Sequence, residues 1–181
     1  MIKRLTAEYI DDIAIAHRLA WQAGFRGILS DPLLDTLTDA EFIEGWKDTI
    51  RRSRRTNLIK VIEYEAVGFV SFGSPYDAQE TVKAEIYGIY VHPHYWRKKI
   101  GYELITAAMK EIRKKDGYNG AILWTMSKNT RSAAFYREVG FRVTNQKRTS
   151  QRNGEFFEEV KCQYDAIGKS SAVCVKDSRG I

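Results

Sequence analysis

The chain has 181 residues, 44% of them hydrophobic and 12% aromatic, which is enough to bury the core of one domain and excludes a disordered protein. Lysine and arginine exceed aspartate and glutamate by 29 − 23 = 6. This moderate excess favours an anionic partner without choosing between nucleic acid and a phosphate-rich cofactor.

The two cysteines, Cys162 and Cys174, lack the spacing of a zinc site or of a disulfide framework. No segment has the length and apolar character of a secretory signal or a membrane span. We therefore expect a cytoplasmic protein with no metal site and no membrane partner.

The first part of the chain favours two helices. Residues 9–23 carry apolar side chains at helical spacing, namely Ile10, Ile13, Ala16, Leu19, Ala20 and Ala23. A second helix is predicted to begin near Thr38 or Asp39, which precede the capping-box residue Glu41. The arginines after it are interpreted as a solvated helix end, because no aromatic platform for bases is interleaved with Arg51, Arg52, Arg54 and Arg55.

From Leu58 the pattern becomes that of strands and then alternates. Residues 58–64 and 66–73 predict an antiparallel hairpin. The elements expected after it are a strand at 82–91, a helix at 101–115, a strand at 121–126, a helix at 130–139, and two closing strands at 141–150 and 156–166. Asn153-Gly154, between the closing strands, is the commonest two-residue hairpin signal.

This order predicts one α/β (α+β) domain over residues 1–165, with a mixed, mostly antiparallel central sheet and helices on both faces. Residues 166–181 are rich in small and polar types, and we expect them to form a flexible tail.

The most informative segment is the basic turn between the strand that ends at Val91 and the following helix. Backbone N–H groups at a helix start, together with the positive end of the helix dipole, can bind a phosphate. Arg97, Lys98 and Lys99 add charge there, and Gly101 permits close backbone approach. The turn predicts a pyrophosphate site, although a surface connection with solubilising lysines would have the same composition.

This segment resembles the acyl-CoA-binding motif of the GNAT superfamily of acetyltransferases. That motif is a strand, an arginine or glutamine, two variable residues, a glycine, a variable residue, and a glycine or alanine. Val91, Pro93 and Gly101 match it, whereas Trp96 replaces the arginine or glutamine and Lys99 replaces the first glycine. A positive φ angle at Lys99 would cost about 1–2 kcal/mol.

Residues 129–141 resemble the second signature of the same family. The matching residues are Asn129, Ser132, Phe135, Tyr136, Gly140 and Phe141. The resemblance implies that Asn129 hydrogen-bonds the cofactor and that Tyr136 reaches its sulfur. From the residues alone, Asn129 is equally a helix cap and Tyr136 a packing residue.

The resemblance, specific over about residues 58–145, implies an N-acetyltransferase. It would transfer an acetyl group from acetyl-CoA to a primary amine by direct attack in a ternary complex, the acceptor being a small molecule or a peptide. The question of whether the protein forms a homodimer is left open. The implied cofactor contacts are the main chain of Ile89, Tyr90 and Val91, the turn residues Arg97, Lys98, Lys99, Gly101 and Tyr102, and Asn129.

For catalysis the resemblance implies Tyr136 as the acid and Glu85 as the base. A carboxylate on a largely apolar strand favours a raised pKa, but Glu85 could equally face solvent or pair with a lysine. Other tyrosines compete for the acid role, namely Tyr87, Tyr90, Tyr95 and Tyr102. His92 and His94 are interpreted as surface residues.

The segment "HRLAWQAGFRGIL" resembles the family's cover of the acceptor site. His17, Trp21 and Phe25 are therefore candidates to line a pocket, with core packing as the alternative. Two other functions compete with the enzyme. A non-catalytic acyl-CoA-binding or sensor domain would have the same fold. A nucleic-acid-binding domain is supported by the net charge and the arginine run alone, and we predict no nucleic-acid partner.

Overall fold

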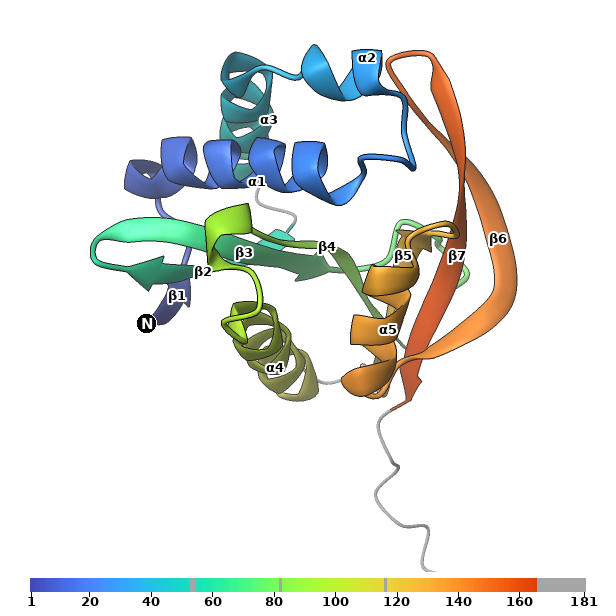
Figure 1. Cartoon of the computed structure of the whole chain (residues 1–181). Coiled ribbons are helices and arrows are strands. Elements are labelled where there is room, and N and C mark those ends of the chain that lie inside the picture. The colour runs from blue at the N-terminus through green and yellow to red at the C-terminus, as the bar shows by residue number, and fades with distance from the viewer. Residues whose placement is uncertain (53–54, 82, 116, 166–181) are drawn as a thin grey trace, which may run out of the picture.

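A seven-stranded sheet with helices on both faces forms the domain (Figure 1). The computed structural model describes residues 1–52, 55–81, 83–115 and 117–165, so the predicted tail at 166–181 lies outside the described residues. The strand order is β1-β2-β3-β4-β5-β7-β6, in which β4 and β5 are parallel and the other neighbours antiparallel. The predicted fold class is confirmed.

The strands are β1 (Ile2–Arg4), β2 (Arg55–Ile62), β3 (Glu65–Gly73), β4 (Ala84–Val91), β5 (Gly120–Met126), β6 (Arg142–Arg152) and β7 (Glu155–Asp165). The helices are η1 (Ala7–Tyr9), α1 (Ile10–Gly24), α2 (Asp31–Asp35), α3 (Asp39–Arg51), η2 (Pro93–Tyr95), α4 (Ile100–Arg113) and α5 (Thr130–Glu138). Every longer element that the sequence predicts is present, and the short elements β1, η1, α2 and η2 are additional. None of the described helices is long and apolar enough to cross a membrane.

Local sequence signals explain where several elements begin and turn. Asn153 and Gly154 have φ angles of 47° and 84°, as a tight hairpin with two left-handed residues requires. Helix α3 begins with a complete capping box, in which the Thr38 and Glu41 side chains each bond the other residue's backbone N–H.

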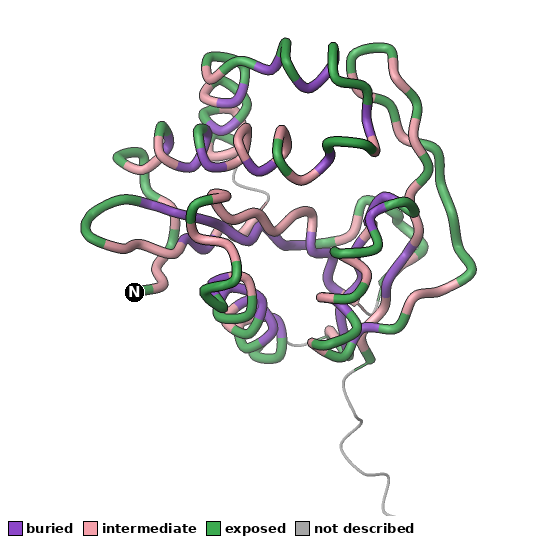
Figure 2. Tube along the Cα trace, in the orientation of Figure 1, coloured by how far each residue is buried: buried purple, intermediate pink, exposed green. Residues whose placement is uncertain are grey.

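Two hydrophobic layers enclose the sheet, and the buried positions follow the central strands and the inner helix faces (Figure 2). Helices α4 and α5 cover one face, where Leu104 packs in a cluster with Val70 and Leu123. Helices α1, α2 and α3 cover the other face, where Ile13 and Phe69 are buried together. Because helices cover both faces of the sheet, a ligand can approach the sheet mainly at the ends of its strands.

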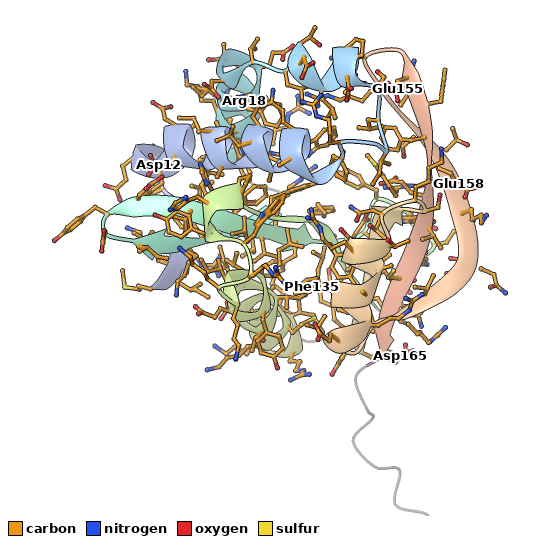
Figure 3. The ribbon with its side chains drawn as sticks, in the orientation of Figure 1. Asp12, Arg18, Phe135, Glu155, Glu158 and Asp165 are labelled. Carbon is orange, nitrogen blue, oxygen red and sulfur yellow. The ribbon has the colours of Figure 1, made fainter. Side chains whose placement is uncertain are left out.

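Polar contacts fix the α1–α3 layer to the rest of the domain (Figure 3). The Asp12 carboxylate accepts a hydrogen bond of 2.9 Å from the backbone N–H of Ala66 on β3. The Glu155 carboxylate accepts hydrogen bonds from the backbone N–H and the hydroxyl of Ser30, at 3.0 and 2.6 Å. This last contact ties the tip of the β6–β7 hairpin to the start of α2.

Candidate active site

The centre of the site is the point where β4 separates from β5. Their parallel pairing covers Ala84–Ile86 and Ala121–Leu123, yet β4 continues to Val91 and β5 to Met126. The register of β4 against β3 also shifts beside Gly88, which pairs with Ser71 while Ile86 pairs with Phe72. Such a bulge bends a strand and commonly adjoins a functional site. Residues 87–91 therefore present a strand edge on which an extended ligand can pair.

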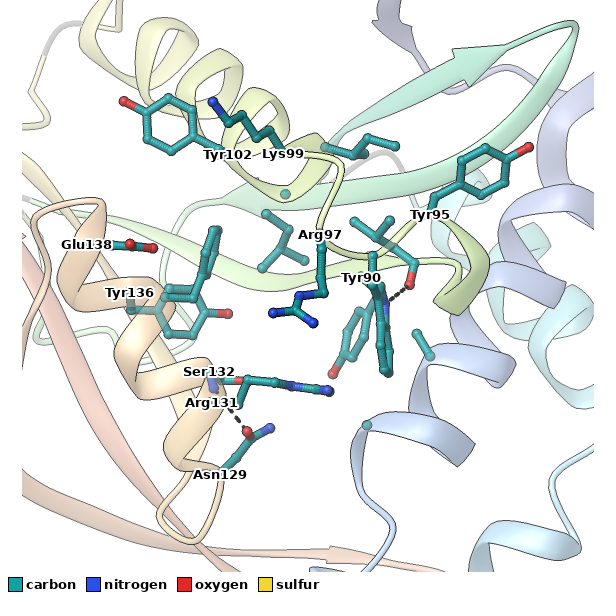
Figure 4. A pocket seen from close by; sticks show the side chains of 18 of the residues that line it. Tyr90, Tyr95, Arg97, Lys99, Tyr102, Asn129, Arg131, Ser132, Tyr136 and Glu138 are labelled. Carbon is teal, nitrogen blue, oxygen red and sulfur yellow. Dashed lines mark hydrogen bonds between the residues drawn. The ribbon is translucent and has the colours of Figure 1, made fainter.

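The loop that follows β4 leads directly into the start of α4. Lys99 is the N-cap residue of helix α4, and its side chain forms no capping hydrogen bond, unlike the N-cap residues of α2, α3 and α5. The first backbone N–H groups of α4 are therefore not occupied by a capping side chain, which suits an anion. The indole N–H of Trp96 donates a 2.7 Å hydrogen bond to the carbonyl oxygen of Val91 (Figure 4). Trp96 thus closes this loop, at a position where the resembling motif has arginine or glutamine.

The loop has a strained backbone at two cationic residues. Arg97 and Lys99 have φ angles of 64° and 61°, in the left-handed region that glycine adopts most readily. The positive φ considered for Lys99 from the sequence is therefore present, with its cost of about 1–2 kcal/mol. Strain of this kind is commonly retained where a ligand binds.

A cavity of about 1000 Å³ lies between this loop, the end of β4 and helix α5 (Figure 4). The predicted residues that line it are Ile89, Tyr90, Val91, Arg97, Lys99, Gly101, Tyr102, Asn129 and Tyr136. Lys98 is not among its lining residues, and its ammonium group lies over the Tyr95 ring, 4.8 Å from the centroid. Both lysines were predicted from the sequence to contact the cofactor, but only Lys99 lines the cavity.

Positive charge gathers in this cavity. Arg97, Lys99 and Arg131 line it, and none of the three forms an ion pair with a carboxylate of the described residues. The Arg131 guanidinium instead stacks on Trp96, 4.3 Å from the ring centroid. Sequence reasoning missed Arg131, although its place beside Asn129 in the second signature was a signal. The cavity can therefore hold an anion of more than one charge.

Two residues of the second signature have defined roles in α5. The Asn129 side-chain oxygen accepts a 3.0 Å hydrogen bond from the backbone N–H of Ser132, so it caps the helix. Its amide NH2 is the part that remains to contact a ligand. Burial, and then the neighbouring Tyr90 and Cys162, raise the pKa of Tyr136. The Tyr136 phenol therefore stays protonated at neutral pH and keeps a proton that it can donate in a hydrogen bond.

A second, smaller cavity of about 290 Å³ lies under the α1–α3 layer, and Tyr90 lines both cavities. Aromatic rings make up much of its wall, from His17, Trp21, Phe42, Trp46, Phe69, Tyr87 and Tyr90. Burial and the charge of Arg152 lower the pKa of His17 to about 3, so this imidazole is neutral. His17 and Trp21 thus line this cavity, whereas Phe25 lines the larger one.

Arginines supply the positive charge of the smaller cavity. Arg55 and Arg152 both line it. The interpretation of the arginine run as a solvated helix end is therefore wrong for Arg55, which begins β2 and stacks on Tyr87, 4.4 Å from the ring centroid. Arg51 and Arg52 agree with that interpretation, because both pair with Asp48 on the surface. Arg54 lies outside the described residues.

Glu85 lines neither cavity. Its carboxylate is buried and accepts a 2.8 Å hydrogen bond from the backbone N–H of Tyr76. Burial raises the pKa of Glu85, and the charges of Arg148 and Arg55 oppose this shift. The expected surface position or lysine partner is not found within the described residues. Any proton transfer between Glu85 and the smaller cavity therefore needs an intermediary such as water.

The two predicted surface histidines have places in the loop after β4. His92 accepts a 3.1 Å hydrogen bond at Nδ1 from the backbone N–H of His94, which caps the short helix η2. Neither histidine lines a cavity.

Comparisons with known proteins identify the family of the chain. Residues 20–141 match the model of the acetyltransferase (GNAT) family. The chain is 25% identical over 156 residues to a spermidine N(1)-acetyltransferase of Thermoplasma acidophilum, covering 78% of this chain and 88% of that one.

Solved structures share the fold. The PaiA N-acetyltransferase of Thermoplasma acidophilum, in complex with coenzyme A, superimposes with a TM-score of 0.70 at 19% identity and covers 91% of this chain and 98% of that one. The ribosomal-protein-alanine N-acetyltransferase of Brucella melitensis gives a TM-score of 0.67 at 21% identity, with coverage of 91% and 99%. The family match spans most of the domain and includes both signature segments, and the chain therefore belongs to the GNAT family of acetyltransferases.

Proposed function

We propose that this protein transfers an acetyl group from acetyl-CoA to a primary amine by direct attack in a ternary complex. The observation that carries the proposal is the cavity of about 1000 Å³ between the separated end of β4, the uncapped start of α4, and α5. The Thermoplasma acidophilum relative of the same fold was solved with coenzyme A. When bound, acetyl-CoA supplies the acetyl group as a thioester.

The residues present fit this cofactor. Arg97, Lys99 and Arg131 offer charge to its phosphates, and the start of α4 offers backbone N–H groups. A Cβ atom built on Gly101 would lie 3.5 Å from the Phe135 ring, which is ordinary contact, so the protein alone does not require glycine there. A ligand that approaches the backbone closely would require it. The edge of β4 at Ile89–Val91 suits the main-chain pairing expected for the pantetheine arm.

Three groups are proposed to act during the transfer. Glu85, through water, accepts the proton that the amine must lose, because an alkyl ammonium with a pKa of about 10.4 is unreactive. A backbone N–H of the β4 edge, near Val91, stabilises the negative charge that develops on the thioester oxygen. The Tyr136 hydroxyl donates to the leaving sulfur.

The smaller cavity favours an enzyme over a cofactor-binding module. Tyr90 lines both cavities, so an acceptor held in the smaller one would lie next to the larger one, where the thioester is proposed to bind. The cytoplasmic location and a homodimer stay predictions.

Two neighbouring lysines provide the test of cofactor binding. Lys99→Ala is expected to weaken acetyl-CoA binding about fivefold, because an exposed cation contributes modestly. Lys98→Ala should change it less than about twofold, because Lys98 does not line the cavity. Titration calorimetry at two salt concentrations measures both, and the difference between the variants should shrink at high salt. Equal effects would refute the placement of the phosphates, and no binding by the wild type would refute the function.

A further inference from the structure

The smaller cavity contains buried polar groups that the protein does not satisfy. The buried side-chain atoms of its lining that have no hydrogen-bond partner within the described residues include these three: Arg152 Nε, Trp46 Nε1 and Ser71 Oγ. Buried polar groups are nearly always hydrogen-bonded, because leaving them unpaired is unfavourable. Two of the three atoms are N–H donors, and one belongs to a cation. The missing partner is therefore an acceptor of hydrogen bonds, and an anionic one suits it best.

Arg152 is held in place from two sides. It is the last residue of β6, at the tip of the hairpin that Glu155 ties to Ser30. Its guanidinium carbon lies 5.1 Å from the Trp21 ring centroid and 5.5 Å from that of Phe42. No carboxylate of the described residues forms an ion pair with it. The stacking orients the charge without neutralising it.

The other charged groups of the lining are Arg55 and Glu41. Arg55 adds a second positive charge. Glu41 is exposed, and its carboxylate is engaged by the backbone N–H of Thr38 at 3.1 Å. His17 is neutral. The cavity as a whole is therefore positive, and a polycationic acceptor such as spermidine would meet repulsion there.

We propose that the acceptor is a small amine that also carries a carboxylate and an apolar group, as an apolar free amino acid does, and that Arg152 binds its carboxylate. This inference rests on the proposed acetyltransferase function. The aromatic walls suit the apolar group, and a volume of about 290 Å³ suits one small molecule. With the carboxylate at Arg152, the amine would point toward Tyr90, which lines both cavities.

The test compares matched acceptors with the wild-type protein and acetyl-CoA. Leucine, methionine and phenylalanine are each compared with their amides, and spermidine is added as a polycation. The amides lack the carboxylate and have a lower amine pKa, so amine ionisation alone favours them. We expect the acids to be acetylated with a kcat/KM about 30-fold higher than the amides, within the range of a charged hydrogen bond.

Variants of two arginines on β6 test whether Arg152 causes the preference for acids over amides. Arg152→Gln should lower kcat/KM for the acids about 30-fold and leave the amides within about threefold. Arg152→Lys should keep part of the activity toward the acids, because it keeps the charge. Arg142→Gln is the matched control, since Arg142 lies at the other end of β6 and pairs with Asp165 at 3.3 Å outside both cavities. Binding of leucine, followed by the fluorescence of Trp21 and Trp46, gives a readout independent of turnover.

The outcomes separate this inference from the proposed function. If spermidine or the amides are acetylated with the same kcat/KM as the acids, the inference is overturned while the acetyltransferase function stands. An equal loss for every acceptor in folded Arg152→Gln also overturns it. If acetyl-CoA binds but no amine is acetylated, the function itself fails. Should Arg152→Gln not fold, the comparison of acids with amides in the wild type and Arg152→Lys still decides.

Discussion

Tyr136→Phe is expected to lower the turnover number about 100-fold, at the lower end of general-acid effects, because thiolate is a fair leaving group even without a donor. The Tyr136 hydroxyl lies in the wall of the larger cavity, and burial raises its pKa, so it remains a donor at neutral pH. Acetyl-CoA affinity should hardly change, because the hydroxyl acts on charge that develops during the reaction. Pre-steady-state release of CoA, combined with calorimetry, measures both quantities.

Tyr102→Phe is the matched control for this variant. Tyr102 lines the same cavity but is 56% exposed, and it lies at the start of α4 rather than on α5. We expect its turnover to stay close to that of the wild type. A Tyr136→Phe enzyme with wild-type turnover, or equal losses in both variants, would remove Tyr136 from the proton-donor role.

Glu85→Gln is expected to lower the rate about 100-fold near neutral pH and to recover part of it in alkali. The amine must be neutral before it attacks, and in alkali more of it already is. The base must be ionised, so the wild-type rate should rise as the pH passes the raised pKa of Glu85. A pH–rate profile of both proteins over acid to alkaline pH measures this difference.

Stability distinguishes lost chemistry from damaged packing in this variant. Because the pKa of Glu85 is higher in the folded state than in the unfolded chain, protonation of Glu85 stabilises the folded state. Its stabilising contribution is complete below the ordinary pKa and is lost as the pH rises through the raised one. Glutamine resembles the protonated form and can still accept from the Tyr76 N–H. Denaturant unfolding at neutral pH should therefore show Glu85→Gln to be at least as stable as the wild type. A pH–rate profile of Glu85→Gln with the same shape as that of the wild type would exclude Glu85 as the base.

The smaller cavity, which we propose for the acceptor, bears on how far the similarity to the spermidine acetyltransferase extends. The two chains are 25% identical. In this chain Arg55 and Arg152 line that cavity and place positive charge where a polyamine would need negative or neutral groups. Members of one fold can therefore share the acetyl donor and differ in the acceptor.

The sequence by itself determined most of the fold and the segments that line the larger cavity. The helical spacing from Ile10 to Ala20, the Thr38–Glu41 box and the Asn153-Gly154 turn are local signals, and each element formed where its signal lay. The basic turn and the second signature were likewise readable, because they combine charge, glycine and a helix start within a short segment. The elements that sequence analysis missed, β1, η1, α2 and η2, are three to five residues long and too short for a periodic pattern.

The tertiary structure alone decided which charged residues face the sites. Lys98 and Lys99 are adjacent and chemically alike, yet Lys99, with its left-handed backbone, lines the larger cavity, whereas Lys98 does not and lies over the Tyr95 ring. Arg55 and Arg152 are about a hundred positions apart, and the sheet, the hairpin tip and the α1–α3 layer bring them to one cavity. Glu85 shows the reverse, because the register of β4 buries it against Tyr76, away from both cavities. Local patterns specify elements, whereas the direction of a side chain depends on packing between segments distant in sequence, which no local pattern contains.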